Sequence, residues 1–322
     1  DEGNTIPFIA RYRKEAHGTL DDQVLREIAE RLEYLRNLDK RREEVRASIE
    51  GQEKLTEEIS AALSNAATLA EIEDIYRPFK PKRRTRASIA REKGLEPLAQ
   101  VLYEQRPDCK EPLALALDFL NPEKGVETAE DALKGALDII AENLSDDATI
   151  RRRLRNLFTV CGVVRSKSAK EEDSVYAPYY DFSAPVEKIA GYQVLAIDRG
   201  EREGFLKVSV TLDRPRAIKV ISSVALKSTE SPCTCAVLEA GEDAYDRLIE
   251  PSIEREIRSA LTQRAATAAI KVFSTNLRQL LLQPPVKGKV ALGLDPGYRT
   301  GCKVAIVDAT GRVLDTGVIY IT

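Results

Sequence analysis

The amino-acid sequence predicts a mainly α-helical protein: an elongated helical array with long bracing helices, a small β-containing insertion and a strand-rich carboxyl end. Three observations support this fold class. Apolar residues recur at three- and four-residue steps through most of the first half of the chain. Alternation at every second residue first appears after residue 200. Three short apolar runs then follow one another beyond residue 289.

The first long helical pattern begins after Asp21 and Asp22, which are suited to an N-cap. Its apolar residues share one helical face: Val24, Ile28, Leu32, Leu35, Leu38, Val45 and Ile49. Charged residues fill the other positions, so we expect one helix of roughly seven or eight turns. Shorter helical patterns follow at residues 55–67, 69–76, 95–104, 112–120, 129–144 and 148–161. No fixed repeat period relates them, so a solenoid is not predicted.

The composition changes after Val164, where residues 165–180 are polar and lack periodicity. Leu206, Val208, Val210 and Leu212 then alternate with polar residues, which predicts a half-buried strand. Asp213–Arg216 is expected to form a turn and Ile218–Leu226 to return as a second strand.

A second long helix is predicted over 253–282, where Pro284 and Pro285 stop it. Beyond Lys289 we expect strands at 290–294, 303–307 and 313–319, the last two joined by a turn at 309–311. These patterns predict four segments. Residues 1–165 form a helical amino-terminal domain, 166–240 a mixed α/β insertion with a strand pair, 241–286 a helical segment with the long connecting helix, and 289–322 the start of an α/β domain.

Composition excludes several classes of protein. The 322 residues carry a net charge of −3 with a pI of about 5.7, so any contact with nucleic acid has to come from local basic patches. No apolar run approaches the ~20 residues of a membrane-spanning helix. Five scattered cysteines favour a reducing cytoplasm over a disulfide framework. The absence of methionine and the strand-like end at residues 319–322 indicate part of a longer protein.

The sequence GLDPGYRTGCK at 293–303 is the most informative motif. An apolar strand ends at Asp295, Pro296 and Gly297 turn the backbone, and a second strand returns. In RNase H-like folds the first metal-binding carboxylate occupies this place, so 289–322 is expected to begin an RNase H-like domain with Asp295 as a metal ligand. A complete site would hold Mg²⁺ with several carboxylates. We expect Asp308 and Asp315 to be turn residues and this chain to hold no cofactor.

Two other interpretations of this motif stay open. It is also an ordinary tight turn, and it resembles the first phosphate loop of actin-like ATPases. Such loops prefer small residues after Asp-x-Gly, whereas Tyr298 and Arg299 are bulky. A phosphate loop of the Gly-x-x-x-x-Gly-Lys type does not occur in the sequence.

The second candidate site is the basic segment at residues 80–86, KPKRRTR, which contains no acid. Its five cations are Lys80, Lys82, Arg83, Arg84 and Arg86. Extended cations can each meet a backbone phosphate and release counterions. Nearby Tyr76 and Phe79 could stack on bases. The alternative is a solvated loop, or one paired with the acidic stretch at residues 71–74.

Other polar clusters favour structural roles. Arg151, Arg152, Arg153 and Arg155 lie on one helix but point in different directions, so a solvated, salt-bridged helix is the favoured interpretation. Cys233 and Cys235 have the wrong spacing for zinc. His17 is the only histidine, so the chain has no Cys–His or Ser–His catalytic pair, and we expect a structural role for it.

Four stretches resemble bacterial Tex proteins, a family of transcription accessory proteins. GNTIPFIARYRKE at 3–15 resembles their amino-terminal helical segment, and DIYRPFKPKRRTR at 74–86 is similar to their basic segment. NLRQLLL at 276–282 and the motif at 293–303 resemble the entry to their RNase H-like (YqgF) domain.

This resemblance implies a cytoplasmic, helix-turn-helix-containing protein whose partners are RNA or DNA and the transcription machinery. In the family, helix-hairpin-helix modules and an OB-fold RNA-binding domain follow the RNase H-like domain. We therefore expect the main nucleic-acid surface outside these 322 residues. The favoured function is a non-enzymatic nucleic-acid-binding scaffold, and the alternative is a metal-dependent nuclease of the RNase H-like or resolvase class.

Overall fold

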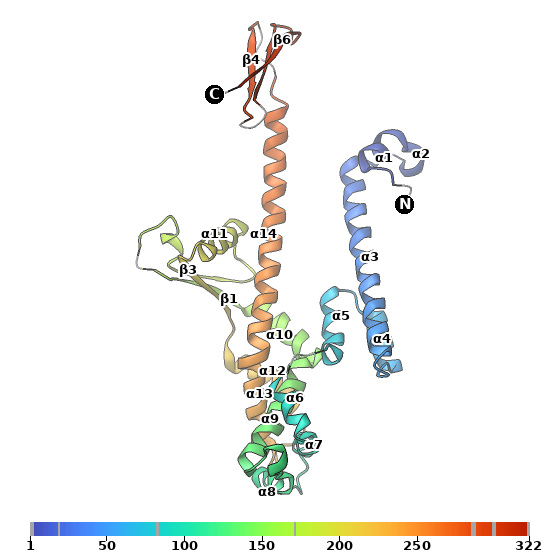
Figure 1. The fold of residues 1–322 in the computed structure, drawn as a ribbon, viewed down its shortest axis with the longest axis vertical. Helices are drawn as coiled ribbons and strands as arrows, with labels where there is room; N and C mark the ends of the chain where they lie inside the picture. Colours follow the sequence, from blue (N-terminus) through green and yellow to red (C-terminus); the bar gives the residue numbers. More distant parts are fainter. Residues whose placement is uncertain are drawn as a thin grey trace. The chain divides into compact units, whose positions relative to one another are not determined.

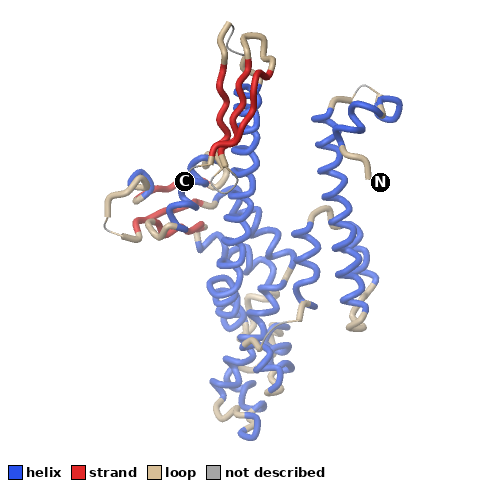
Figure 2. Tube along the Cα trace, turned by 45° about the horizontal axis from the view of Figure 1, so that its top comes forward, coloured by secondary structure: helices blue, strands red, loops and turns tan. Residues whose placement is uncertain are grey.

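The computed structural model describes residues 3–18, 20–81, 84–170, 172–284, 288–297 and 301–320. The chain divides into two compact units, residues 1–262 and 263–322, which are described separately below. Helices account for most of the described residues, and the strands form two separate three-stranded sheets (Figures 1 and 2). The prediction of a mainly helical protein with small strand-containing parts is confirmed.

The amino-terminal helices follow the predicted apolar periodicity. They are α1 (Ile6–Tyr12), α2 (Lys14–His17), α3 (Asp22–Glu50), α4 (Glu57–Asn65) and α5 (Leu69–Tyr76). The Asp21 side chain accepts a hydrogen bond from the Val24 amide at 2.9 Å, which confirms the predicted N-cap of α3. Only the carboxyl half of the α3 stripe is buried, because Val24, Ile28, Leu32 and Leu35 are all exposed.

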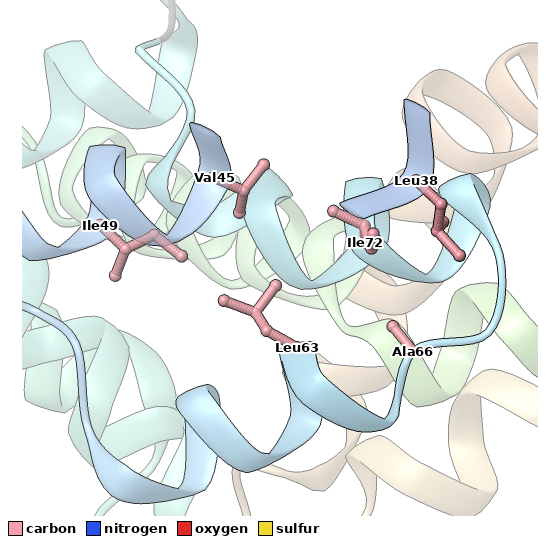
Figure 3. Packing of buried hydrophobic residues seen from close by; sticks show 6 residues of the cluster. All are labelled: Leu38, Val45, Ile49, Leu63, Ala66 and Ile72. Atoms are coloured by element: carbon pink, nitrogen blue, oxygen red, sulfur yellow. The ribbon is translucent and has the colours of Figure 1, made fainter. Parts of the chain in front are cut away.

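Helices α3, α4 and α5 enclose a small apolar core. Leu38, Val45 and Ile49 of α3 meet Leu63 of α4, Ala66 of the α4–α5 connection and Ile72 of α5 (Figure 3). All six are buried, and burying such side chains stabilises a fold by about 1.5–3 kcal/mol each for the larger ones. This core positions α5, whose carboxyl end leads into the basic segment.

Helix α9 (Ala129–Asp146) is the centre of the remaining helices of the first unit, because it packs against α6, α7, α8, α10 and α13. Its neighbours are α6 (Arg86–Glu92), α7 (Glu96–Glu104), α8 (Pro112–Ala116), α10 (Ala148–Cys161) and α13 (Thr234–Asp243). Short 3-10 turns, η1 (Arg77–Phe79), η2 (Leu117–Phe119) and η3 (Pro122–Lys124), connect them. Every shorter helix predicted between residues 55 and 161 is present, whereas α6 and α13 were not predicted.

A three-stranded antiparallel sheet follows α10, with order β2-β1-β3. Its strands are β1 (Val163–Ser168), β2 (Asp181–Pro185) and β3 (Leu206–Thr211), with the 3-10 turn η4 (Ala177–Tyr179) before β2 and α11 (Gly191–Arg202) before β3. The prediction of a strand from residue 206 is confirmed. Its partner is β1, in a stretch where no strand was predicted.

The predicted return strand at 218–226 is wrong, because this stretch belongs to helix α12 (Arg214–Ala225). Pro215 lies in its first turn after Asp213, an arrangement that favours a helix start. Ala217, Ile221 and Ala225 are buried at four-residue spacing, which is helical rather than strand-like.

The second long helix is confirmed: α14 runs from Glu250 to Leu281, just before Pro284. A π-helical segment, η5 (Ala244–Ile249), joins it to α13. In the second unit the three predicted strands are present as β4 (Ala291–Asp295), β5 (Cys302–Val307) and β6 (Val313–Ile319). They form an antiparallel sheet of order β4-β5-β6.

A buried ionic network joins α5, α10 and the start of α14. Arg151, which has no exposed surface, donates through Nε to Asp74 Oδ1 at 3.1 Å and through Nη2 to Glu256 Oε1 at 2.6 Å. It also donates to Ser252 Oγ at 3.0 Å and to the Ser145 carbonyl. Arg155 makes two hydrogen bonds to Asp74, at 2.8 and 3.0 Å, and one to Glu256 at 2.9 Å.

These contacts correct the interpretation of the α10 arginines. They are salt-bridged, as predicted, but the helix is not simply solvated: Arg151 is buried and Arg155 is half-buried, whereas Arg152 and Arg153 are exposed. Burial alone would lower the pKa of Arg155, but hydrogen bonds from the guanidinium to Asp74 and Glu256 outweigh it and raise that pKa. The network therefore stabilises the charged form of Arg155.

We expect Asp74→Asn to lower the free energy of unfolding by about 3–5 kcal/mol, because it leaves the buried Arg151 without one of its carboxylates. Urea unfolding followed by circular dichroism measures this. The matched control is Glu73→Gln, at the next position of α5, which removes the partially exposed pair with Arg41 and should cost at most about 1 kcal/mol. Equal destabilisation by the two substitutions would contradict the proposed importance of the network.

Candidate nucleic-acid interface

The basic segment leaves α5 through the turn η1 and ends at α6. Its first end is anchored by Arg77, which reaches Ser252 Oγ of the ionic network at 3.4 Å, and by the Phe79 carbonyl, which accepts from Gln52 Nε2 at 2.9 Å. Its second end is anchored by Thr85 and Ser88, which form a reciprocal capping box at the start of α6. The cations between them therefore lie between two fixed points.

The described cations of the segment face solvent. The Lys80 side chain is 58% exposed and its ammonium lies 3.8 Å from Glu73; the Arg84 side chain is 74% exposed and lies 3.9 Å from Glu92. Arg86 is exposed at the first position of α6. Long, exposed ion pairs of this kind contribute little, so both cations can exchange partners. Lys82 and Arg83 lie outside the described residues.

Burial lowers the pKa of Arg77, and the neighbouring positive charge of Arg151 lowers it further. Arg77 therefore belongs to the supporting structure rather than to the exposed cations. The acidic stretch 71–74, the alternative partner of the segment, also contains one residue near the segment and one that supports the fold. Glu73 lies near Lys80, whereas Asp74 is buried against Arg151 and Arg155.

The side chains of Tyr76 and Phe79 already make contacts within the fold. Both rings are partly buried against the apolar core of α3, α4 and α5. The Tyr76 hydroxyl lies 3.0 Å from Ser48 Oγ, and the Arg41 guanidinium stands over its ring at 5.5 Å. These contacts disfavour base stacking by either residue and leave phosphate contacts as the chemistry that the segment can supply.

Asp295 ends strand β4, opposite Lys303 of β5, and the described residues do not complete a metal site around it. No group of three or more histidine, cysteine, aspartate or glutamate side chains in the described ranges could hold a metal ion. Hard cations such as Mg²⁺ take six or more oxygen ligands, so Asp295 alone does not fit one. Asp295 as a first ligand stays a prediction.

The other two acids of the second unit lie beside turns and strands. Asp308 Oδ1 accepts hydrogen bonds from the Thr310 hydroxyl and amide and from the Arg312 amide, and these contacts lower its pKa. Asp315 lies on β6 opposite Ile306, rather than in a turn, and its Oδ1 accepts from the Thr316 amide at 2.8 Å.

The remaining polar residues of interest have structural neighbours. His17 Nε2 lies 3.1 Å from the Ile9 carbonyl oxygen. Cys233 does not pair with Cys235: its Sγ lies 3.1 Å from Cys109 Sγ, and burial together with this neighbour raises its pKa to about 12. The Cys109 contact could not be found from spacing, because the two residues are 124 positions apart.

Three family models match the chain. The Tex-like protein N-terminal domain matches residues 1–50, the Tex central region-like model matches 108–273, and the Tex protein YqgF-like domain matches 289–322. The central model alone covers more than half of the 322 residues. The chain therefore belongs to the Tex family, as its sequence motifs predicted.

Full-length relatives extend well beyond this chain. YdcI of Bacillus subtilis is 43% identical over 99% of this chain and 45% of its own length. The transcriptional accessory protein Tex of Neisseria gonorrhoeae is 40% identical over 100% of this chain and 43% of its length. Human S1 RNA-binding domain-containing protein 1 is 35% identical over 100% of this chain and 34% of its length. The chain thus spans less than half the length of these relatives. None of the helices in its described part combines the length and apolarity needed to cross a bilayer.

We expect no Mg²⁺- or Mn²⁺-dependent cleavage of RNA or DNA by this chain, because one carboxylate cannot hold the pair of cations that such cleavage uses. The measurement is incubation of labelled RNA and DNA with either metal, with EDTA as the blank. Asp295→Asn and the control Asp315→Asn, on strand β6, should behave like the unsubstituted chain. Divalent-dependent cleavage that disappears only in Asp295→Asn would overturn this expectation.

Proposed function

We propose that this chain is part of a non-enzymatic nucleic-acid-binding scaffold that acts as a transcription accessory factor. The observation that carries the proposal is the basic segment at residues 80–86, whose described cations are exposed and whose two ends are held by the fold of an otherwise acidic chain. RNA or DNA is the proposed ligand, and the transcription machinery is the proposed protein partner. The names of two relatives, a transcriptional accessory protein and an S1 RNA-binding domain-containing protein, support this choice.

The physical basis of binding is counterion release. Each cation that meets a phosphate releases a counterion, so affinity falls steeply with salt. With a net charge of −3 the chain has no global attraction for a polyanion, and binding has to come from local cations. We expect sequence-independent binding with a dissociation constant of about 10⁻⁴–10⁻⁶ M at physiological salt.

The helices supply rigidity rather than chemistry in this proposal. The ionic network and the core of α3, α4 and α5 fix the start of the basic segment, and α6 fixes its end. The division into segments 1–165, 166–240, 241–286 and 289–322 and a cytoplasmic location belong to the same proposal. The five cysteines are all free, which suits a reducing compartment.

A metal-dependent nuclease is the competing function, and Asp295 is the residue that would contribute to it. It requires further carboxylates around the metal. Further carboxylates placed around Asp295 would favour the nuclease, and their absence would favour the scaffold.

Neutralising Lys82, Arg83 and Arg84 together to Gln should reduce the slope of log affinity against log salt by roughly two to three, if each residue meets one phosphate. Fluorescence anisotropy with labelled single- and double-stranded RNA and DNA over a salt series measures this slope.

The matched control for this test neutralises Lys110, Lys124 and Lys134, which are exposed elsewhere on the first unit. It should leave the salt slope unchanged. If the basic-segment variant also leaves affinity and slope unchanged, residues 80–86 form a solvated or internally paired loop and the proposal fails.

A further inference from the structure

Four elements that pack together in the first unit contain cations and no carboxylate. They are α10 (Ala148–Cys161), β1 (Val163–Ser168), β3 (Leu206–Thr211) and α12 (Arg214–Ala225). Only Gly162 separates α10 from β1, and two residues separate β3 from α12. Helix α10 and strand β1 thus form one continuous arm, and strand β3 and helix α12 form a second.

The two arms lie side by side in antiparallel order. Strand β1 pairs with β3 along its whole length, and α10 packs against α12. Arg153 Nη1 donates to Ser223 Oγ at 3.3 Å between the helices. The antiparallel arrangement brings together cations that are some 40 residues apart in the sequence, and so concentrates positive charge in one part of an acidic chain.

Several of these cations already have partners. Arg151 and Arg155 belong to the buried ionic network, and Arg214 pairs with Glu242 and Asp246 at 2.9 Å. Within the described part of the chain, Arg165, Lys167 and Lys207 take part in no ion pair. All three are exposed, and all three lie on the sheet.

The register of the sheet places these three residues on one face. Val164, Ser166 and Val210 are buried on the opposite face, the side of the sheet on which Val194 and Ile197 of α11 lie. On the exposed face, Lys167 stands between Asp181 of β2 and Lys207 of β3, and Arg165 stands between Ser183 and Ser209. Two rows of residues therefore contain three cations and one carboxylate.

This arrangement is unfavourable for the chain alone. Lys167 and Lys207 are directly opposite each other on neighbouring strands, and like charges at such positions destabilise a sheet. The groove beside this face is lined from the face itself by Arg165, Lys167, Lys207, Ser209 and Thr211, which are all basic or hydroxyl-bearing. Ser168 and Val208, which the register places on the opposite face, complete its lining. A polyanion lying on this face would relieve the repulsion and accept hydrogen bonds from the hydroxyls.

We propose that this exposed face of β1 and β3 binds the phosphodiester backbone of a nucleic acid. The site is separate from the basic segment at residues 80–86 and does not require that segment to bind. Residues two apart on a strand project about 6.6–6.8 Å apart, and strands lie about 4.7–4.9 Å apart. The three cations are thus spread over an area that suits successive phosphates rather than one. Among the described residues, no aromatic side chain lines the groove, so we expect phosphate contacts rather than base stacking and binding that does not depend on sequence.

The decisive variant is Lys207→Glu, because it separates stability from binding. A glutamate opposite Lys167 turns a repulsive cross-strand pair into an attractive one, so the melting temperature should stay the same or rise. For binding, the substitution removes Lys207 from the site and places a second carboxylate beside Lys167, in addition to Asp181, so that both cations are lost to the ligand. The salt slope should therefore fall by roughly 1.8 for duplex DNA and roughly 1.4 for single strands. The 322-residue chain and short labelled RNA and DNA are the materials, and anisotropy over a salt series is the readout.

The matched control is Lys110→Glu, the same change of charge at an exposed position between α7 and α8. It should leave the slope unchanged. Equal losses in the two variants would show a general charge effect and overturn the proposal, as would an unchanged slope in Lys207→Glu. If Lys207→Glu lowers the melting temperature, Arg165→Gln replaces it and should lower the slope by about 0.7–0.9.

Two further experiments separate this proposal from its alternatives. Poly-glutamate that binds this face as tightly as nucleic acid would overturn the assignment to phosphodiesters, as would full competition by inorganic phosphate at equal ionic strength. The triple variant at Lys82, Arg83 and Arg84 separates the two sites. A slope that falls in Lys207→Glu but not in the triple variant supports the sheet face and contradicts the basic segment, and the reverse result does the opposite.

Discussion

The first unit depends on one constraint: the hydrogen-bond donors of a single buried guanidinium, that of Arg151, all need acceptors. Arg151 has no exposed surface, so every donor it presents has to find an acceptor inside the protein. The acceptors come from three places in the chain: Asp74 on α5, the Ser145 carbonyl at the end of α9, and Ser252 with Glu256 on α14. Desolvating an arginine is costly, and only this full set of partners offsets the cost. The position of α5, and of the basic segment that follows it, is tied to this one side chain.

The same network divides the cations of the chain into two kinds. Arg151 and Arg155, one helical turn apart, point inward and hold elements together, whereas Arg152 and Arg153 point outward. A similar division occurs beside the basic segment, where Arg77 supports the fold and Lys80 faces solvent. Net charge alone describes neither kind. A polyanion can bind only those cations that are not already paired within the fold.

Much of the fold follows from local pattern. The long helices α3 and α14 and the three strands of the second unit were predictable, because apolar spacing and proline positions act over a few residues. Strands β1 and β2 were not, since they are short and polar and gain their stability from partners far along the chain. The apolar residues at 218–226 fit the spacing of a strand as well as that of a helix. Only the helix start at Asp213 and Pro215 favours the helix. Sequence also identified the basic segment, but the sheet face depends on a register that no local pattern contains. The burial of Arg151 was equally hidden, because its three neighbouring arginines look identical to it in sequence.

The geometry of Arg151 has a consequence for how this protein can change over evolutionary time. Its Nε and Nη atoms contact acceptors in different directions, which a lysine with a single terminal ammonium cannot reproduce. Asp74 and Glu256 lie 77 and 105 positions away from it, yet none of the three residues can be exchanged without leaving a charge unmatched. Arg155 shares the same two carboxylates, so the four positions depend on one another. An apolar replacement that leaves no charge unmatched would have to change all four at once.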